Sequence, residues 1–445
     1  MAGSCIRTRR LAGGVWRTSG WALLANAALA QTFVVDDDGG PGVAFTDLPV
    51  AVASVPSGAV LRVRTGTYSA FSIAHKSITV LGDGPQSVQI DWQSGAMALG
   101  PSGVADTIVL ADVSFRGADY LRHVIQDAAG AVVLSNVTRT GFGKVLWEIR
   151  NSTNVHLHRV VWDAPSRGML FAPGPSVRAV SATVQIEDST VVGGRLVRGV
   201  LSPAGNGEPA LWAKDSRILL FDSALSGGAG EDCADVSRFV PFGAPATDGG
   251  PGLVMDGGRV YAVSSVIAGG AGGATVCTYP SPSRGGDGLQ LTNQTVAEFW
   301  GAGPIAGAAG LSGQPGMASV VDPSSTLAVR PGEPGLRARL TGASFPGNTV
   351  AFELTAPPGI PAVAFFGNFA QHLPLEPLVP GSLLVAPILA AGPFAVPSGG
   401  TLRLPYVVPS RWLLDSVFYG QFLALDPATG ELRSSNSFPW ITKSR

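Results

Sequence analysis

The side chains best suited to chemistry stand at alternate positions of short apolar runs. His156 and His158 flank Leu157, so on a strand both imidazoles point to the same side. In the next such run, Gln185 and Glu187 hold the equivalent positions and are expected about 4.8 Å away, on the neighbouring strand. A His–Glu pair can exchange protons with a substrate or bind a metal. The alternative interpretation is a solvated polar surface.

A second group of charged and aromatic residues follows another set of short strands, one in each repeat. Its members face outward if the apolar residues between them face inward: Glu148, Arg150, Trp212, Lys214, Asp256, Gln290 and Thr292. Acids in the segments between repeats are expected to reach the same surface: Glu208, Glu231, Asp232, Asp235 and Asp287. An indole among charged groups suits a sugar, which has apolar faces and polar edges. The group predicts a groove that binds an extended glycan, with an ordinary surface as the alternative.

The acidic run Asp36, Asp37 and Asp38 ends a short strand before Gly39 and Gly40. Carboxylate oxygens in such a run can hold a hard cation such as calcium. The alternative is a turn whose charges blunt the exposed edge of a sheet. No other cofactor is expected.

Two cysteines, Cys233 and Cys277, are left once an N-terminal export signal containing Cys5 is removed. Each follows a Gly-Gly-Ala-Gly motif, at Gly227–Gly230 and Gly269–Gly272, so the two occupy the same phase of consecutive repeats. An even pair in an exported protein predicts one disulfide.

The element that must position these residues is a repeated strand of the form apolar-x-apolar-x-Asp or Asn. Its copies end at Asp112, Asn136, Arg159, Asp188, Asp222 and Ser264. Asp and Asn tolerate the left-handed conformation, so a stacked ladder is expected at one corner. Short strands joined by such corners predict the coils of a parallel β-helix. Insertions at 165–176, 195–208, 229–248 and 271–286 share one phase of the repeat and predict walls beside the groove.

The N-terminal part carries a family resemblance. The motifs DDDG, FTDL, VPSG, VRTGTY and ITVLGDG, in this order, resemble the N-terminal cap and first coils of the pectin lyase-like superfamily of right-handed parallel β-helices. A helix within Phe45–Val55 is expected to cover the open end of the first coil. The resemblance implies polysaccharide lyases, polygalacturonases and pectin methylesterases as relatives. The polygalacturonase motifs N-T-D, G-H-G and R-I-K are absent, and function depends on the site rather than on the fold.

Composition and pattern divide the chain of 445 residues. Its 59 Gly and 34 Pro predict a turn-dense all-β protein. Residues 1–30 combine a basic start, a short apolar run and an A-x-A site, which predicts an export signal. A right-handed parallel β-helix is expected at 32–310 and a small antiparallel β-sandwich at 321–445. The Gly/Ala/Pro stretch Gly301–Gly316 is expected to be a linker, and the boundary between the two domains is placed at 311–320. Phe418–Asn436 resembles a C-terminal β-domain of secreted proteins from environmental bacteria.

The predicted location is secreted, periplasmic or cell-surface, with no membrane span. Removing residues 1–30 deletes four arginines and moves the net charge from −1 to −5, which argues against nucleic acid as a partner. A monomer is expected. The first function hypothesis is a glycan-binding or surface-interaction protein that uses the groove. The alternatives are a carbohydrate-active enzyme, lyase or hydrolase, on the same groove, and a purely structural or adhesive surface protein.

Overall fold

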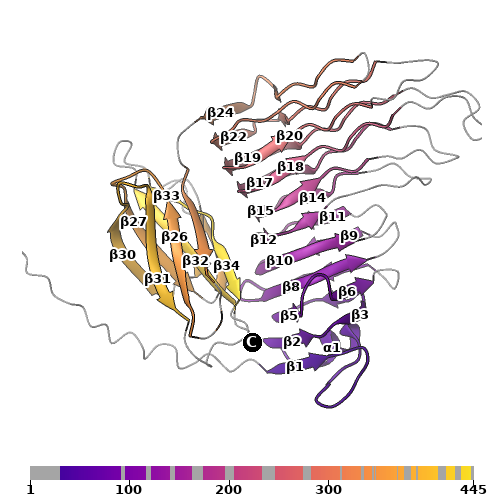
Figure 1. Ribbon diagram of the computed structural model, residues 1–445, viewed down its shortest axis with the longest axis vertical. Coiled ribbons are helices and arrows are strands. Elements are labelled where there is room, and N and C mark those ends of the chain that lie inside the picture. The colour runs from indigo at the N-terminus through magenta and orange to yellow at the C-terminus, as the bar shows by residue number, and fades with distance from the viewer. Residues whose placement is uncertain are drawn as a thin grey trace, which may run out of the picture.

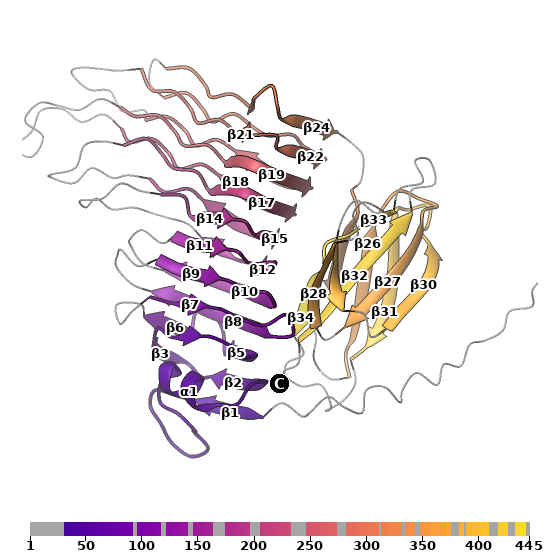
Figure 2. The ribbon, with the colours of Figure 1, turned by 180° about the vertical axis from the view of Figure 1, so that it is seen from behind.

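The computed structural model describes residues 31–91, 96–116, 122–140, 146–162, 174–195, 205–232, 246–273, 282–310, 313–331, 335–342, 345, 347–367, 369–374, 382–386, 389–408, 417–425 and 432–441. A parallel β-helix, here called the rod, is followed by antiparallel sheets (Figure 1). These sheets lie beside the rod rather than extending it (Figure 2). No helix in these ranges is long and apolar enough to cross a bilayer.

The rod has three faces of parallel strands. Face A contains β1 (Thr32–Val35), β2 (Ala59–Val63), β5 (Ile78–Gly82), the first part of β8 (Thr107–Arg116) and β10 (Ala131–Thr140), β12 (Asn154–His158), β15 (Thr183–Glu187), the second part of β17 (Leu211–Phe221) and β19 (Leu253–Val263), β22 (Val296–Trp300) and β24 (Thr326–Arg330). Face B contains β3 (Gly66–Ser69), β6 (Val88–Asp91), the ends of β8 and β10, β13 (Val161–Trp162), β16 (Thr190–Val192), β18 (Ala224–Ser226) and β20 (Val266–Ala268). Face C contains β4 (Ser72–Ile73), β7 (Ala98–Leu99), β9 (Arg122–Gln126), β11 (Leu146–Arg150), β14 (Val177–Val180), the starts of β17 and β19, β21 (Leu289–Thr292) and β23 (Ser319–Val321).

Register sets the core, because each inward side chain stacks on its counterpart in the next coil. Ile186, Leu220 and Ala262 are successive register partners, and all three are buried. One apolar core therefore runs from Val35 in the first coil to Phe299 in β22. The predicted fold class, a parallel β-helix followed by antiparallel sheets, is confirmed.

The predicted corner ladder is also confirmed. Its residues all take the left-handed conformation, with φ between 47° and 57°: Asp112, Asn136, Arg159, Asp188, Asp222 and Ser264. The Asn136 amide donates a hydrogen bond of 2.6 Å to the Asp112 carboxylate on the coil before it. Arg159 shares the conformation of its neighbours, so the stacked strands impose the corner even where the residue type does not favour it.

The first coil is covered by α1 (Leu48–Ser54), within the predicted range. The Asp47 side chain accepts from the Leu48 N–H, and Pro49 occupies the first turn, where a missing N–H costs nothing. Leu48, Ala51 and Val52 are buried and close the end of the core.

At the other end the rod continues past the predicted linker. Strands β23 and β24 pair in parallel with β21 and β22, so the coils reach Arg330 instead of ending near 310. The described part of the Gly-rich stretch is fixed by backbone hydrogen bonds, including Gly316 N to Gly307 O at 3.1 Å. A Cβ added to Gly316 would lie 1.9 Å from the Gly286 oxygen. Glycine serves close packing here rather than flexibility, and the linker prediction is wrong.

The roots of the insertions pack in the same way and form what we call the glycine slab. Its segments are 193–195, 205–209, 227–232, 246–251, 269–273, 282–288, 305–310 and 313–317. The N–H of Gly250 donates to Gly228 O at 2.7 Å, and the N–H of Gly270 donates to Gly250 O at 2.8 Å. A Cβ on Gly228 would lie 2.0 Å from the Gly194 oxygen, so only glycine allows this spacing. The slab leaves the rod on the side away from the C-terminal sheets (Figures 1 and 2).

The C-terminal domain, residues 335–441 in the described ranges, is built of antiparallel sheets. One sheet holds β25 (Arg337–Thr341), β26 (Thr349–Thr355) and β31 (Thr401–Val407). A second holds β27 (Pro361–Gly367), β30 (Leu389–Ala395), β32 (Val417–Leu425), β33 (Leu432–Ser434) and β34 (Phe438–Ile441), and β28 (Phe369–Pro374) pairs with β29 (Ser382–Ala386). Both larger sheets contribute to one core, in which Phe352 stacks on Trp440 with ring centroids 4.5 Å apart.

Candidate functional site

The predicted glycan-binding residues meet on face C. Glu148, Arg178 and Trp212 are register partners on three successive strands, and Lys214, Asp256 and Thr292 form a parallel row beside them. We call these two rows the face-C stripe: Glu148, Arg150, Arg178, Trp212, Lys214, Asp256, Gln290 and Thr292. Arg178 was missed in the sequence. Its signal was its place between inward Val177 and Ala179, equivalent to Glu148 one coil earlier.

Glu148 anchors one end of the stripe and is only 2% exposed. One of its carboxylate oxygens lies 2.5 Å from Arg150 Nη2 and 3.7 Å from Arg178 Nη1. Burial of a carboxylate is tolerated when it is paired and hydrogen-bonded. Glu148 therefore positions two guanidinium groups on face C.

Trp212 projects outward as predicted, since its neighbours Leu211 and Ala213 are fully buried in the core. The Arg178 guanidinium lies 4.8 Å from the centroid of the indole ring, a cation–π contact. This contact fixes the indole at the surface, where it is partly exposed. The stripe thus places a fixed aromatic ring next to a cation that Glu148 also holds.

The second row continues the charge pattern. Lys214 Nζ lies 3.9 Å from Asp256, and the Thr292 hydroxyl donates to the same carboxylate at 3.4 Å. Gln290 donates to Asp287 at 2.9 Å. Asp287, a predicted flanking acid at the end of the glycine slab, is therefore bonded to the stripe.

The other flanking acids lie in the slab or outside the described residues. Glu231 is buried there, and its N–H donates to the Thr247 hydroxyl at 2.7 Å. Asp232 pairs with Arg195 at 3.7 Å. Glu208 belongs to the hydrogen-bonded backbone of the slab. Asp235 and both predicted disulfide partners, Cys233 and Cys277, fall outside the described residues.

The predicted polar patch lies on face A, and most of it is buried rather than exposed to solvent. Its residues are His156, His158, Gln185 and Glu187. His156 pairs in register with Gln185, and His158 with Glu187. All four alternate with core residues, yet His156, Gln185 and Glu187 are only 1%, 2% and 4% exposed. The C-terminal domain covers them. The interpretation as a solvated surface is therefore wrong for three of the four residues: His156, Gln185 and Glu187 lie in a buried seam between the rod and the C-terminal domain, and His158 lies partly exposed at its edge.

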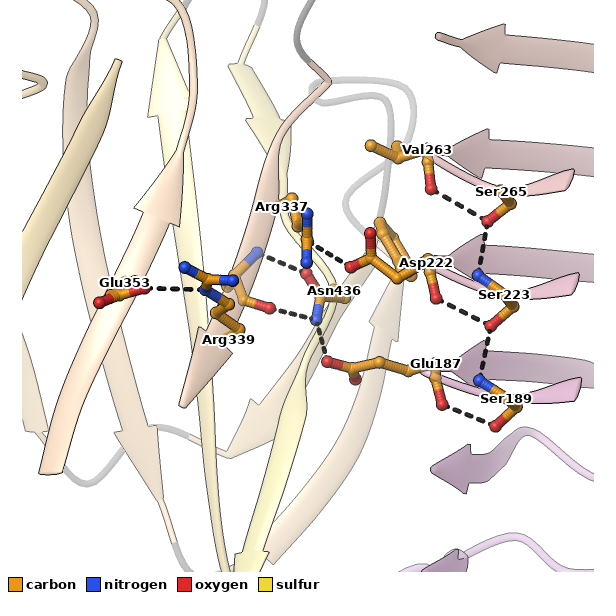
Figure 3. A network of polar contacts seen from close by, with 12 residues as sticks. Glu187, Ser189, Asp222, Ser223, Val263, Ser265, Arg337, Arg339, Glu353 and Asn436 are labelled. Carbon is orange, nitrogen blue, oxygen red and sulfur yellow. Dashed lines mark hydrogen bonds and ion pairs between the residues drawn. The ribbon is translucent and has the colours of Figure 1, made fainter. Parts of the chain in front are cut away.

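The segment Ser435–Ser437 lies in this seam. The Gln185 amide donates to Ser437 O and accepts from Ser437 N at 3.1 Å, so it binds that backbone as a neighbouring strand would. A side chain of the C-terminal domain also reaches the rod: the Asn436 amide donates a hydrogen bond of 2.9 Å to the Glu187 carboxyl group (Figure 3). Asn436 also pairs with both backbone groups of Ala338, at 2.6 and 2.7 Å. Side-chain amides from each domain thus satisfy buried polar groups across the seam.

Burial changes the proton affinity of the patch. Desolvation lowers the pKa of His156 to about 4 and that of His158 to about 3, so both imidazoles are neutral at pH 7. Desolvation, reinforced by Asp188, raises the pKa of Glu187 well above its usual value. Burial also raises the pKa of Asp222, on the next coil, to about 6. Asp222 forms an ion pair with Arg337 of the C-terminal domain (Figure 3).

A ladder of buried serines supports the edge of this seam. The Ser223 hydroxyl donates to Phe221 O at 2.8 Å and accepts from Ser189 N at 3.2 Å, and Ser265 repeats the pattern one coil on (Figure 3). The hydroxyls satisfy backbone groups at a corner where strand pairing lapses. The ladder keeps the Glu187 and Asp222 coils in fixed register.

Apolar clusters flank the seam on both sides. On one side, Tyr419 of β32 packs among Leu81, Val109, Ala111, Ala131 and Val133. On the other, Trp300 packs with Leu219, Phe221 and Val263, and its ring lies 4.7 Å from both the Arg330 and the Arg433 guanidinium carbons. Face A is therefore a docking surface with a polar centre and apolar sides.

Among the described residues, two groups of three side chains bring potential metal ligands within 4.8 Å of one another. The first is His158, Glu187 and Asp188, beside the seam; the second is Asp36, Asp37 and Asp38. In the second group, Asp36 pairs with Arg64 at 2.9 Å and Asp37 accepts from Thr67 N at 2.8 Å. These bonds favour the turn interpretation over a calcium site.

Sequence reasoning also missed a histidine inside the rod. His123 is fully buried, its ring centroid lies 5.1 Å from that of Trp147 and 5.8 Å from that of Phe115, and desolvation lowers its pKa to about 3. Trp147 in turn stacks on Trp162. With its Nδ1 accepting from Met97 N at 3.3 Å, His123 is an aromatic core residue.

The sequence matches no family model and no curated protein. Among solved structures, ORF18 of Geobacillus virus E2 matches with 14% identity and a TM-score of 0.23, over 87% of this chain and 81% of that one. Full-length tailspike protein 2 (ORF211) of the Escherichia coli O157:H7 bacteriophage CAB120 matches with 10% identity and a TM-score of 0.27, over 92% of this chain and 64% of that one. At these TM-scores neither likeness carries an inference about function.

Proposed function

We propose that the protein is an exported binding protein that holds an extended polysaccharide along face C of the rod. The observation that carries the proposal is the face-C stripe. There a partly exposed indole, in contact with the Arg178 guanidinium, belongs to one of two adjacent rows that carry charged and amide side chains along the coils. Indole rings stack on the apolar faces of sugars, while charged and amide groups bind their hydroxyls.

Faces A and B are less suited to binding a polysaccharide. Face A is covered by the C-terminal domain through the seam around Glu187 and Asn436. Face B has Val161, Thr190 and Val266 exposed in its later coils, and its charged residues Asp91 and Arg116 lie in the first coils, away from any exposed aromatic ring described there. Face C combines charge, an aromatic ring and a rigid backbone, which a repeating ligand requires.

The proposal also covers export of the protein, its superfamily and its disulfide. We take residues 1–30 as an export signal, the rod as a member of the pectin lyase-like superfamily, and Cys233–Cys277 as one disulfide. Mass spectrometry of the secreted protein under non-reducing conditions tests the signal and the disulfide together. A mature N-terminus at Gln31 and a mass two hydrogens below the reduced form are expected.

Glycan-array binding and affinity electrophoresis test the function, with Trp212→Ala as the variant. Losing the stacking surface costs about 1 to 2 kcal/mol, roughly a 5- to 30-fold weaker affinity. Val266→Ala is the matched control, because Val266 is an exposed outward residue on face B, away from the stripe. Thermal unfolding of both variants within a few degrees of wild type shows that the rod is intact.

The outcomes separate the three hypotheses. Binding that Trp212→Ala weakens and Val266→Ala does not supports the proposal. Release of unsaturated uronates or new reducing ends from a bound polysaccharide establishes the enzyme instead. A folded protein that binds no glycan leaves the structural or adhesive role and overturns the proposal.

A further inference from the structure

Three side chains that can ligate a metal lie at the edge of the seam, where face A meets the corner ladder. His158, Glu187 and Asp188 each bring a possible ligand atom within 4.8 Å of the other two. His158 and Glu187 are register partners on neighbouring strands, so their side chains point the same way. Asp188 follows Glu187 at the left-handed corner, with φ of 47°. We call these three side chains the seam-edge cluster.

The spacing of the cluster is close to that of a metal site. Three atoms no more than 4.8 Å apart leave an ion at their centre at most about 2.8 Å from each of them. Bonds from zinc to imidazole nitrogen and carboxylate oxygen are about 2.0 to 2.2 Å long, so the cluster has to close by less than about 1 Å. Asp188 is exposed, so a rotation of its side chain can supply this movement.

Hydrogen bonds already orient two of the three ligands, as outer-shell groups do in metal sites. His158 Nδ1 lies 3.1 Å from the Ser135 hydroxyl, which leaves Nε2 to bind a metal. The Asn436 amide donates to one oxygen of Glu187 at 2.9 Å, and the Gln185 amide donates to the other at 3.4 Å. A carboxylate has about four lone-pair sites, so Glu187 can keep both bonds and still bind a metal.

Burial prepares the same two ligands. Desolvation lowers the pKa of His158 to about 3, so its imidazole is neutral at pH 7 and has no proton to lose before it ligates. Desolvation raises the pKa of Glu187, because a buried carboxylate lacks the compensation that water gives its charge. A divalent cation supplies that compensation, so binding one displaces the proton from Glu187.

The positive side chains around the cluster have acidic partners or lie in solvent. Arg337 pairs with Asp222, and Arg339 pairs with Glu353 at 2.8 Å (Figure 3). Arg159 is exposed. These arrangements leave the two carboxyl groups of the cluster for a cation.

We propose that the seam-edge cluster binds one divalent transition-metal ion of the zinc class through one nitrogen and two carboxylate ligands. An imidazole nitrogen suits zinc or cobalt, whereas calcium and magnesium prefer oxygen ligands alone. Glu187 is buried, His158 is partly exposed and Asp188 is exposed, so the ion can enter at the edge of the seam and keep a water ligand there. This inference does not depend on glycan binding on face C.

The test is titration of the full chain, free of any affinity tag and stripped with EDTA, with Co²⁺ and with Zn²⁺. Co²⁺ is followed by its visible absorption and Zn²⁺ by calorimetry. The two ions are expected to compete for one site, from which about a hundredfold excess of Ca²⁺ does not displace Co²⁺. His158→Gln should weaken the affinity by about a hundredfold or more and Asp188→Asn by about tenfold or more, because changes even to outer-shell partners cost about 10- to 100-fold.

Asp112→Asn is the matched control, since it makes the same substitution at the equivalent left-handed corner of an earlier coil. Its affinity for Co²⁺ is expected to match that of wild type. Circular dichroism in EDTA shows whether each variant is folded. If His158→Gln does not fold, Asp188→Asn at its exposed position decides the question, because Asn also tolerates the left-handed corner.

Weaker Co²⁺ binding by the folded cluster variants, with Asp112→Asn unchanged, supports the site. Affinity that either folded cluster variant leaves unchanged overturns it, since the ion is then bound elsewhere. Displacement of Co²⁺ by an equal concentration of Ca²⁺ overturns the nitrogen ligand and with it the proposal. Absence of Co²⁺ and Zn²⁺ binding to wild type also overturns it, and none of these results bears on face C.

Discussion

Replacing Asn436 by Ala should loosen the C-terminal domain from the rod. The Asn436 side chain is fully buried and makes three hydrogen bonds: two to the backbone of Ala338, at 2.6 and 2.7 Å, and one to Glu187, at 2.9 Å. The first two bonds hold β25 within the C-terminal domain, and the third crosses the seam. One substitution therefore leaves the Ala338 N–H, the Ala338 C=O and the Glu187 carboxyl without this partner.

Each buried polar group that loses its partner costs about 1 to 3 kcal/mol. Water entering the vacated space recovers part of this, so we expect a net loss of about 3 to 5 kcal/mol from the C-terminal domain and its docking. Such a loss is a large part of the stability of a domain of this size, which is typically about 5 to 15 kcal/mol. The rod itself should be little affected, because its own core is unchanged.

A double-mutant cycle isolates the bond across the seam. Asn436→Ala, Glu187→Ala and the double variant are compared by urea denaturation, followed by the fluorescence change of the C-terminal transition. We expect a coupling energy of about 1 to 2 kcal/mol between Asn436 and Glu187. Coupling within about 0.5 kcal/mol of zero, with both single variants folded, would refute the assignment of this hydrogen bond as an interdomain contact.

Three further predictions concern the same seam. Burial raises the pKa of Glu187 above its usual value of 4.5, so its contribution to docking is fully present below pH 4.5 and is lost as the pH rises through the raised pKa. The urea midpoint of the C-terminal transition should therefore fall as the pH rises above 4.5, and Glu187→Gln should flatten that dependence. A Cβ on Gly335 would lie 2.8 Å from a Val263 methyl, so Gly335→Val should weaken docking by about 1 to 3 kcal/mol, while an unchanged melting profile would contradict this packing. Ser223→Ala leaves the buried Ser189 N–H without its acceptor and should destabilise the rod by about 1 to 2 kcal/mol in thermal unfolding, with Ser223→Thr as the conservative comparison.

The ladders and strands could be predicted because their causes are local. Alternation from Val184 to Asp188 determines which side chains face the core, and Asp at the last position favours the left-handed corner. The outward direction of Trp212 followed from the same alternation. Because the coils repeat, a local rule applied to one strand also placed its neighbours, and the face-C stripe could be assembled apart from Arg178.

The Gly-rich stretch near Gly307 shows where local rules fail. Glycine permits both a flexible linker and the closest backbone packing, and the residue type alone does not distinguish them. The close packing of this stretch depends on the neighbouring Gly286 and Gly270 segments, which lie at hydrogen-bonding distance only in the folded structure. The linker prediction failed for this reason.

The chain by itself determined its coils, its corners and the residues that point away from the core. The tertiary structure alone decided which outward residues meet solvent. Gln185 and Trp212 are both outward positions of face strands, yet one is buried against Ser437, 252 residues further along the chain, and the other stays at the surface. Alternation specifies a direction within one strand, whereas exposure depends on what a distant segment covers, and no local pattern carries that information.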